Sequence, residues 1–359
     1  MSSAAERFAP KPALEYPFGY KWSPEPGQPF EVMPGVFWLR MPLPISLDHI
    51  NLWLLKDGDG WAIVDCGYDD EGCKSVWQQV FNGFLNPHDV TRIFVTHFHP
   101  DHIGLAAWLS AQCDAPVLMS RGEYRRYRSI LKRDDDELAD QARDYLTELN
   151  YPAEFHERLI AFFKADEKPE ESRVNQSMVE FIQEGDRFEI NGLEWRVIGG
   201  NGHSPEHCCF YNETLNGFIS GDQIIPRISS NVSVYLANRD DDPLGDWIAS
   251  CEKLRDALPA DTLILPSHQE PFVGVTDRMQ QLIHDHHAQL SFLQGVLKTR
   301  ALPVNEVRQC LFDRELNPVD MVLATGETQA HLNYLLHRAL VEKHLNDQGV
   351  AHYSLPRIK

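Results

Sequence analysis

Three histidines and one aspartate are concentrated in the segment FVTHFHPDHIGLAAW, residues 94–108. They are His97, His99, Asp101 and His102. Imidazoles and a carboxylate at this density are costly to pack unless their lone pairs have a partner, and a metal ion is the obvious one. His97 and His99 flank one residue at the end of a predicted strand, so they point the same way, while Asp101 and His102 begin the following helix. One metal can therefore bind the first pair and a second metal the other pair.

Four further candidate ligands each follow an apolar pattern typical of a strand. They are Asp65 in WAIVDCG, His203 in GGNGHSPEH, Asp222 in FISGDQ and His268 in LILPSHQEP. Taken alone, a histidine or aspartate at a strand end is more typical of a cap or a hydrogen-bonding residue. Together with HxHxDH, however, these residues favour a metal site over a histidine-rich surface loop.

The series HxHxDH, GH, GD and a late histidine resembles the metallo-β-lactamase superfamily over roughly residues 35–275. The glyoxalase-II-like members are most similar, because GHSPEH resembles their GHTPGH and GDQI their GD segment. The resemblance implies an αββα sandwich with two metals at one edge. By that match His97, His99 and His203 hold the first metal, Asp101, His102 and His268 hold the second, and Asp222 bridges them. Asp101 and Asp222 are accordingly the carboxylates expected in catalysis.

Two more residues match the family pattern beside these ligands. Asp65 corresponds to the aspartate of VDTG, with Cys66 in place of threonine, and is expected to orient the ligands. His207 follows the ligand His203 by four positions and is expected to support it. The family's glycines are replaced by Glu206 in GHSPEH and by Ser267 and Gln269 around His268. We expect these departures to alter the shape of the pocket and not metal binding.

Imidazole and carboxylate donors without thiolate suit zinc, iron or manganese and do not choose among them. We expect two divalent ions, zinc ahead of iron or manganese. A dinuclear site lowers the pKa of a bridging water, so that hydroxide can attack an ester, thioester, lactam or phosphoryl centre at neutral pH. The second metal then stabilises the oxyanion or the leaving group. There is no GxSxG pattern, and the mechanism needs no side-chain nucleophile.

Two segments are candidates for substrate contacts. The run RGEYRRYR, residues 121–128, contains Tyr124 and Arg125 among several arginines that can grip an anionic group, although a solvated helix face balanced by the following DDDE is an equally simple interpretation. Arg227 and Asn231 lie in PRISSN, just after Asp222. That loop is expected to lie near the metals.

The elements that must position these residues predict an α/β fold. Residues 1–34 are rich in proline and are expected to form an extended arm. Residues 35–275 form the catalytic domain, in which strands alternate with helices, and a charged helical insertion interrupts it at about 121–180. Residues 276–359 are predicted to form a helical domain, with 327–346 helical and a short last strand at 351–355, and they resemble the winged-helix-like extension found in a branch of the same superfamily.

The amino-acid composition limits the kinds of partner that we expect for the protein. The 359-residue chain is 43% hydrophobic with a net charge of −20, which supports a large core and argues against nucleic acid or an anionic membrane as partner. No basic stripe marks the tail, so it is expected to build a wall or a homodimer contact. Without a secretory signal or an apolar span, and with seven cysteines in no regular framework, we expect a soluble, cytoplasmic protein with reduced thiols.

The leading hypothesis is a metal-dependent hydrolase of a small acyl compound, with a thioester ahead of a lactone or ester. A mononuclear iron persulfide dioxygenase is the first alternative, and a phosphodiesterase or nuclease the second. A β-lactamase is disfavoured, because those enzymes are exported and their second metal site usually uses a cysteine.

Overall fold

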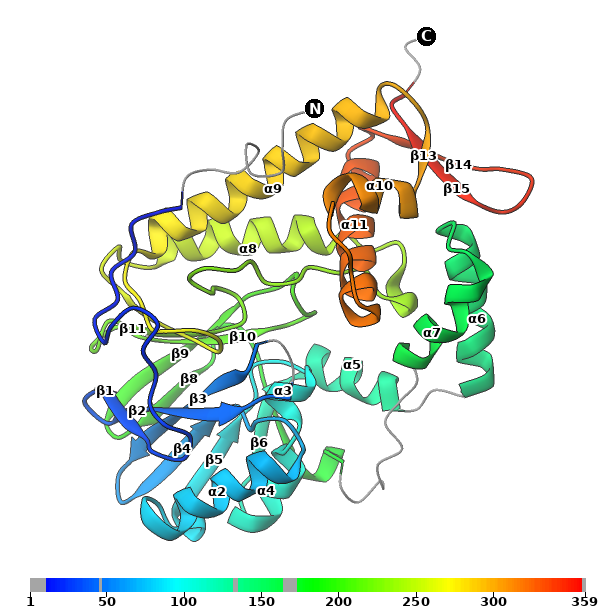
Figure 1. Cartoon of the computed structure of the whole chain (residues 1–359). Helices are drawn as coiled ribbons and strands as arrows, with labels where there is room; N and C mark the ends of the chain where they lie inside the picture. Colours follow the sequence, from blue (N-terminus) through cyan, green and yellow to red (C-terminus); the bar gives the residue numbers. More distant parts are fainter. Residues whose placement is uncertain (1–10, 45–46, 132–134, 164–172, 357–359) are drawn as a thin grey trace.

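Two β-sheets face each other and helices cover their outer faces, in the αββα arrangement that the sequence predicts (Figure 1). The computed structural model describes residues 11–44, 47–131, 135–163 and 173–356. Residues 1–10 of the predicted arm and parts of the predicted insertion, 132–134 and 164–172, lie outside the described residues.

The first sheet has seven strands, which lie side by side in chain order. They are β1 (Phe30–Met33), β2 (Val36–Pro42), β3 (His49–Asp57), β4 (Gly60–Val64), β5 (Val90–Phe94), β6 (Val117–Ser120) and β7 (Val179–Ile182). The pairs from β1 to β4 are antiparallel and those from β4 to β7 are parallel. Parallel neighbours need crossover connections, which are supplied here by α2 (Glu71–Gly83), by α3 (Pro100–Ile103) with α4 (Ala106–Cys113), and by the insertion.

The second sheet has five strands in the order β12 (Leu263–Pro266), β11 (Gly217–Gly221), β10 (Cys208–Asn212), β9 (Leu193–Gly199) and β8 (Arg187–Ile190). Only β11 and β12 are parallel, and the helix α8 (Pro243–Ala257) connects them. The long helix α9 (Val275–Leu297) packs on α8, so both cover the outer face of this sheet (Figure 1).

Strand alternation divides the hydrophobic core into layers. On β3, Trp53 and Leu55 face the other sheet, whereas Leu52 and Leu54 face α2 and α4. Helix α2 buries Cys73, Val76, Trp77 and Val80, the spacing of one helix face, and Asp70 caps it by accepting from the Cys73 N–H. The third layer, beneath α8 and α9, continues into the C-terminal helices.

The insertion consists of α5 (Arg121–Leu131), α6 (Asp135–Glu148) and α7 (Ala153–Phe163). It is followed by the single turn Gln176–Met178 and by β7. The Tyr151 hydroxyl contacts Thr325 Oγ1, and the Asn305 N–H donates to the Leu149 carbonyl at 3.1 Å. The loop after α6 therefore packs against the C-terminal helices.

The C-terminal part contains β13 (Leu302–Pro303), α10 (Val304–Leu311), α11 (Pro318–His337), β14 (Glu342–Leu345) and β15 (Ala351–Ser354). The three strands form a small sheet in the order β13, β15, β14. The helical prediction for 327–346 is wrong at its end, because α11 stops at His337 and residues 342–345 pair with β15. Ala339 adopts a positive φ of 53°, which turns the chain out of the helix, although Glu, Lys and Leu there favour helix by composition.

Three other elements differ from expectation. Strand β1 lies inside the range predicted as an arm. Its flanking residues, Pro29 and Pro34, favoured that prediction, but an edge strand tolerates proline at its ends. Strand β7 begins within the last two residues of the range predicted as helical insertion. Helix α8 was not predicted, and its DDPLGDW start offers a clear signal, since Asp242 caps it by accepting from the Gly245 N–H.

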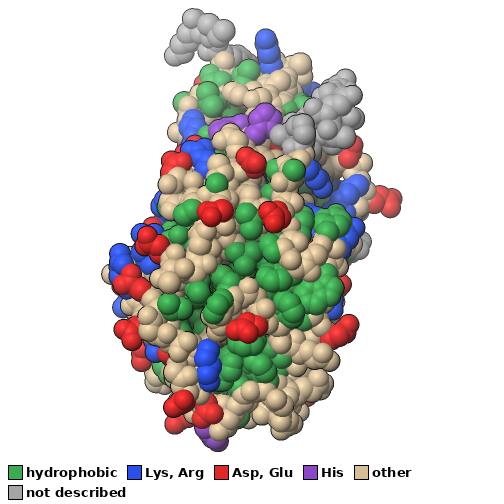
Figure 2. Space-filling model, turned by 90° about the vertical axis from the view of Figure 1, so that its left-hand side faces the viewer, with side chains coloured by type: hydrophobic (Ala, Val, Ile, Leu, Met, Phe, Trp, Pro, Cys, Tyr) green, Lys and Arg blue, Asp and Glu red, His purple; other side chains and the backbone are tan. Residues whose placement is uncertain are grey.

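The described arm residues lie over the domain. Glu15 pairs with Val273, and Trp22 contacts the rings of Phe30 and Trp38. Tyr20, Trp22 and Phe30 are among the exposed large hydrophobic residues, and Figure 2 shows hydrophobic side chains gathered on the face at this side of the molecule. None of the helices in the described ranges combines the length and hydropathy needed to span a membrane.

Candidate metal centre

The predicted ligands meet because each follows the carboxyl end of a strand. Asp65 follows β4 and the HxHxDH segment follows β5 in one sheet, while the other sheet supplies the residues after β9, β11 and β12. These last residues are His203, Asp222 and His268. Because these strand ends lie on one edge of the sandwich, His97 and His203 meet although they are more than 100 positions apart in sequence.

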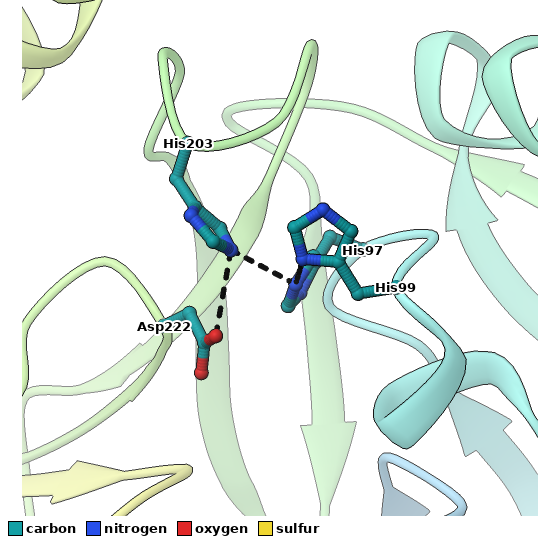
Figure 3. Close-up of side chains that lie close together, drawn as sticks. All are labelled: His97, His99, His203 and Asp222. Atoms are coloured by element: carbon teal, nitrogen blue, oxygen red, sulfur yellow. Dashed lines mark hydrogen bonds and ion pairs between the residues drawn. The ribbon is translucent and has the colours of Figure 1, made fainter. Parts of the chain in front are cut away.

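The first ligand group consists of His97, His99, His203 and Asp222. His97 Nε2 lies 2.9 Å from His99 Nδ1 and 3.2 Å from His203 Nε2. His203 Nε2 lies 3.4 Å from Asp222 Oδ2. Figure 3 shows the four side chains pointing toward one another from three separate loops.

The second ligand group consists of Asp101, His102 and His268. Asp101 Oδ2 lies 3.7 Å from His102 Nε2 and 3.4 Å from His268 Nε2. The same two imidazole nitrogens each lie 3.4 Å from Asp222 Oδ1. The two oxygens of Asp222 therefore face different groups, which is the geometry of a bridging carboxylate.

Each of the five histidines directs one ring nitrogen into its group and holds the other nitrogen with a partner outside it. The partners are Thr96 Oγ1 for His97 at 3.0 Å, the Tyr235 hydroxyl for His99 at 3.4 Å, Asp65 Oδ2 for His102 at 2.8 Å, the Asn231 carbonyl for His203 at 2.7 Å and the His49 carbonyl for His268 at 3.0 Å. A neutral imidazole that donates outward presents a lone pair inward. Such outer partners are typical of metal-binding histidines.

Inward lone pairs without donors repel one another unless a cation lies between them. Among the described residues, His102 Nε2 and Asp222 Oδ1 are buried without a hydrogen-bond partner. Burial, together with the neighbouring histidines, holds the pKa of His97 well below its ordinary value, which favours the neutral, ligating form. The two His/Asp groups are thus consistent with a dinuclear metal site, and these donors do not identify the metal.

Asp65 lies beside the ligands, as expected, and works together with a residue that the sequence reasoning missed. Asp65 Oδ1 accepts from the Thr96 N–H at 2.8 Å, and Thr96 Oγ1 contacts both Asp65 oxygens. The same hydroxyl lies 3.0 Å from His97 Nδ1 and 3.2 Å from His102 Nδ1. Thr96 could have been noticed in the sequence, because it is the one polar residue between the apolar strand and His97.

His207 also lies against the ligands. Its ring stacks on His97 with centroids 4.8 Å apart, and its Nε2 accepts from the Asp222 N–H at 3.2 Å. Burial holds the pKa of His207 well below its ordinary value, so that nitrogen keeps its lone pair. Gly221 has φ +53°, and a Cβ there would lie 2.5 Å from the His207 ring, so only glycine fits before Asp222.

Glu123, also missed from the sequence, connects the insertion to the ligand loops. Its carboxylate is fully buried and accepts from the Phe98 N–H at 2.9 Å and the Glu206 N–H at 2.7 Å. Glu206, which replaces a family glycine, accepts in turn from the Gly122 N–H at 2.6 Å. This departure therefore attaches the start of α5 to the His203 loop. Burial raises the pKa of Glu123 to about 7.

The four residues predicted to contact the substrate lie in different parts of the structure. Arg125 lines a cavity of about 580 Å³ beside His203, and Arg227 lines one of about 370 Å³ beside His268. Arg227 is already paired with Glu270. Tyr124 packs against Phe181, with ring centroids 5.5 Å apart, and is not among the residues that line the His203 cavity; its predicted substrate contact stays a prediction.

Asn231 lies against a candidate ligand, and its predicted substrate contact stays a prediction. Its carbonyl holds His203 Nδ1, and its side chain contacts Ser233 and Glu327. Its backbone carbonyl thus supports a candidate ligand, while its side chain joins the loop to Glu327 of α11. The replacement at Gln269 has a similar internal role, because Gln269 Oε1 accepts from the Arg227 N–H at 3.0 Å.

Most of the chain is similar to known proteins. The family model "Metallo-beta-lactamase superfamily" matches residues 45–268, and the model "Metallo-beta-lactamase-like, C-terminal domain" matches residues 290–356. A crystal structure of a beta-lactamase domain protein from Burkholderia ambifaria is 37% identical, covers 96% of this chain and 98% of its own, and has a TM-score of 0.86.

Two curated relatives extend the comparison. "Probable metallo-hydrolase YqjP" of Bacillus subtilis (strain 168) is 25% identical over 304 residues, which are 83% of this chain and 91% of that protein. An "Atrochrysone carboxyl ACP thioesterase" of Pseudocercospora fijiensis (strain CIRAD86) is 23% identical over 212 residues, which are 59% of this chain and 45% of that protein. The names of these proteins do not mention glyoxalase II, so the finer likeness to that branch stays a prediction. The superfamily match covers residues 45–268, more than half of the chain and all the residues of the two His/Asp groups, and shows that the chain belongs to the metallo-beta-lactamase superfamily.

Proposed function

We propose that this protein is a dinuclear metal-dependent hydrolase of small acyl compounds, with thioesters favoured over lactones or esters. The observation that carries the proposal is the placement of the two Asp222 oxygens, each 3.4 Å from histidine nitrogens of a different ligand group. Two divalent ions held there would lower the pKa of a bound water and polarise the acyl carbonyl.

The chain's own residues preorganise this site. Asp222 and Asp101 supply the carboxylates, and the outer partners of the histidines fix which ring nitrogen faces inward. His97, His99, His203, Asp222 and His268 lie on loops after strand ends, and Asp101 and His102 lie in α3, which follows the loop after β5. Little reorganisation is therefore needed when charge develops on the substrate.

The thioester preference has weaker support than the hydrolase assignment. It draws on the likeness of GHSPEH to the glyoxalase-II-like motif and on the thioesterase among the relatives, of which this chain spans under half. Zinc is the favoured metal, with iron or manganese as alternatives. A small acyl compound is the proposed partner, and neither nucleic acid nor membrane is expected, because the net charge is −20.

The persulfide dioxygenase is the second candidate, since that reaction uses a single iron. A second ligand group with its own aspartate favours the hydrolase over it. A homodimer and a cytoplasmic location remain predictions from the sequence.

The test is cleavage of acyl thioesters by the full chain, followed by chromatography of the acid product, because the seven cysteines would disturb a free-thiol readout. We expect activity to be lost on chelation, restored by zinc, manganese or iron, and reduced by more than about 100-fold in Asp222→Ala. Asp347→Ala, in an exposed turn, is the matched control. Oxygen uptake with one iron and no hydrolysis would replace the proposal with the dioxygenase.

A further inference from the structure

We propose that Arg126 selects acyl substrates that carry a second, anionic group, which its guanidinium binds in the cavity beside His203. This inference rests on the proposed function and deepens it by naming a substrate class. Neither the ligand motifs nor the supporting residues described above include Arg126.

The cavity places Arg126 close to the metal ligands. It has a volume of about 580 Å³ and is lined by Arg126, Phe98, His203, Ser204 and Tyr235, among others. Phe98 lies between the ligands His97 and His99 in sequence, and the Tyr235 hydroxyl is 3.4 Å from His99 Nε2. A molecule in this cavity therefore reaches both the first ligand group and the Arg126 side chain.

The Arg126 guanidinium is held by rings and not by an acid. Its central carbon lies 4.9 Å from the Tyr235 ring centroid and 5.8 Å from the Phe98 ring centroid. Within the described ranges no carboxylate forms an ion pair with it, although the side chain is half-buried. Cation–π contacts orient a guanidinium while leaving its N–H donors available.

Several other arginines of the chain, unlike Arg126, form ion pairs with carboxylates. Arg227 is paired with Glu270, Arg143 with Glu157 and Asp140, and Arg338 with Asp242. A half-buried guanidinium without such a partner is costly, and burial lowers its pKa. A carboxylate or phosphate of the substrate would supply the missing bidentate acceptor.

Glu123 and Asp241 favour the charged form of Arg126 electrostatically, but within the described ranges neither forms an ion pair with it. Asp241 and Asp246 also line the cavity, and Asp241 accepts from the Asn238 amide at 2.9 Å. The buried Glu123 carboxylate is occupied by two backbone N–H groups. Arg125 is exposed and adds a second positive charge to the lining.

The short distance between Arg126 and the first ligand group limits the length of the substrate. The Tyr235 side chain spans the gap, since its ring contacts Arg126 and its hydroxyl contacts the ligand His99. The bound anion therefore lies a few atoms from the reacting carbonyl, as in a short acyl chain that ends in a carboxylate. A phosphate on the leaving group is the other source of the same chemistry.

The experiment compares thioesters of N-acetylcysteamine, a neutral leaving group, with the full-length, metal-loaded protein. The glutaryl thioester carries a terminal carboxylate, and its terminal amide is a neutral analogue of nearly the same shape. We expect kcat/KM to be about 30-fold higher for the acid than for the amide, as a charge-assisted hydrogen bond predicts. In Arg126→Gln this ratio should collapse toward one, and in Arg126→Lys it should be partly retained.

Arg143→Gln, which neutralises a paired, exposed arginine of the same insertion, is the matched control and should keep the wild-type ratio.

A third substrate, a neutral acyl group on coenzyme A, tests whether the anion belongs to the leaving group. An Arg126-dependent preference for this substrate over its N-acetylcysteamine analogue would assign the anion to the phosphates. Equal wild-type kcat/KM within both pairs would overturn the inference while leaving the hydrolase intact. If the wild-type protein cleaves none of these thioesters, the proposed function fails together with it. The wild-type comparison decides the matter even if Arg126→Gln does not fold.

Discussion

At the scale of single residues, the site is defined by what the outward nitrogen of each histidine binds. All five outer partners lie outside the ligand motifs, and two of them are backbone carbonyls, those of Asn231 and His49. Fixing the outward N–H decides which nitrogen ligates. Residues that never touch a metal should therefore control metal affinity.

Thr96 offers the clearest test of that control. Thr96→Val removes a hydroxyl that contacts Asp65, His97 and His102, so we expect metal affinity to fall by about 10- to 100-fold. Competition with a chromogenic chelator measures the affinity. Thr262→Val is the control, because Thr262 is equally buried but donates to Asn216, away from the ligands. An equal loss in both variants would mean that Thr96 acts only through stability.

Glu123 should give stability a pH dependence of known sign. Its pKa is raised from 4.5 to about 7 by burial, so between these values the folded state binds more protons than the unfolded state. The contribution of Glu123 to the free energy of unfolding is thus full below pH 4.5 and is lost as pH rises through about 7. The difference between wild type and Glu123→Gln should decline across this window, by at most about 3 kcal/mol.

Urea denaturation of both proteins at several pH values, with chelator present throughout, measures this difference. Glu154→Gln, at an exposed position of α7, should run parallel to wild type. A wild-type curve parallel to that of Glu123→Gln would show that the carboxyl titrates normally.

Residue types at strand ends were sufficient to predict which histidines and aspartates meet, because HxHxDH, GH, GD and the late histidine are local patterns. Thr96, Glu123 and Tyr235 were missed, because their roles depend on contacts with residues distant in sequence. The loop of Asn231 was expected near the metals, and its carbonyl contacts His203, a contact that no local pattern indicates; a substrate contact of Asn231 stays a prediction.

At the scale of elements, the loop from Asp222 to α8 is held in place by α11. The Val234 N–H donates to the Gly326 carbonyl at 3.1 Å, and Asn231 and Ser233 contact Glu327 and Leu323. The same loop carries the carbonyl that holds His203 and the Tyr235 hydroxyl beside His99. The C-terminal part therefore supports the first ligand group directly.

Gly326 tests this support. A Cβ at Gly326 would lie 2.8 Å from Ser233 Cβ and 3.0 Å from the Val234 carbonyl oxygen, so Gly326→Ala must displace the loop. We expect weaker metal binding at the first group and about a 10-fold loss of kcat/KM, as a misplaced ligand predicts.

Gly295→Ala in α9 is the control, because a Cβ there meets nothing within 4 Å. Its helix should gain about 0.5–1 kcal/mol of stability, with unchanged activity. Full activity in Gly326→Ala would mean that α11 does not position the loop.

Elements with strong periodicity were predicted well, including β2 to β6, α2 and α9. Those decided by tertiary pairing were not. Strands β1 and β14 are four residues long and exist because a neighbouring strand offers a ladder of hydrogen bonds. No local pattern carries that information.

At the scale of the whole molecule, the sandwich is a rigid frame, and the arm, the insertion and the C-terminal part lie around its functional edge. The insertion contacts the C-terminal helices through Tyr151 and Leu149, and its α5 is attached to the His203 loop through Glu206. These contacts argue for a fixed wall around the cavity beside His203.

Metal binding should stabilise this frame, because the ligand groups join both sheets. At a free metal concentration 100 times the dissociation constant, the gain is about 2.7 kcal/mol, and Tm should rise by several degrees. Differential scanning calorimetry with chelator and with added zinc measures the shift. No shift in the presence of zinc, manganese or iron would argue against a metal site.

The most direct test of the dinuclear site is metal stoichiometry. Elemental analysis of the purified, metal-saturated chain, with anomalous diffraction to locate the ions, counts metals at each ligand group separately. The bridging geometry of Asp222 predicts two ions per chain in the wild type, one in each group, and reduced occupancy of both groups in Asp222→Ala. A single ion confined to His97, His99 and His203 in the saturated wild type would contradict the dinuclear hydrolase.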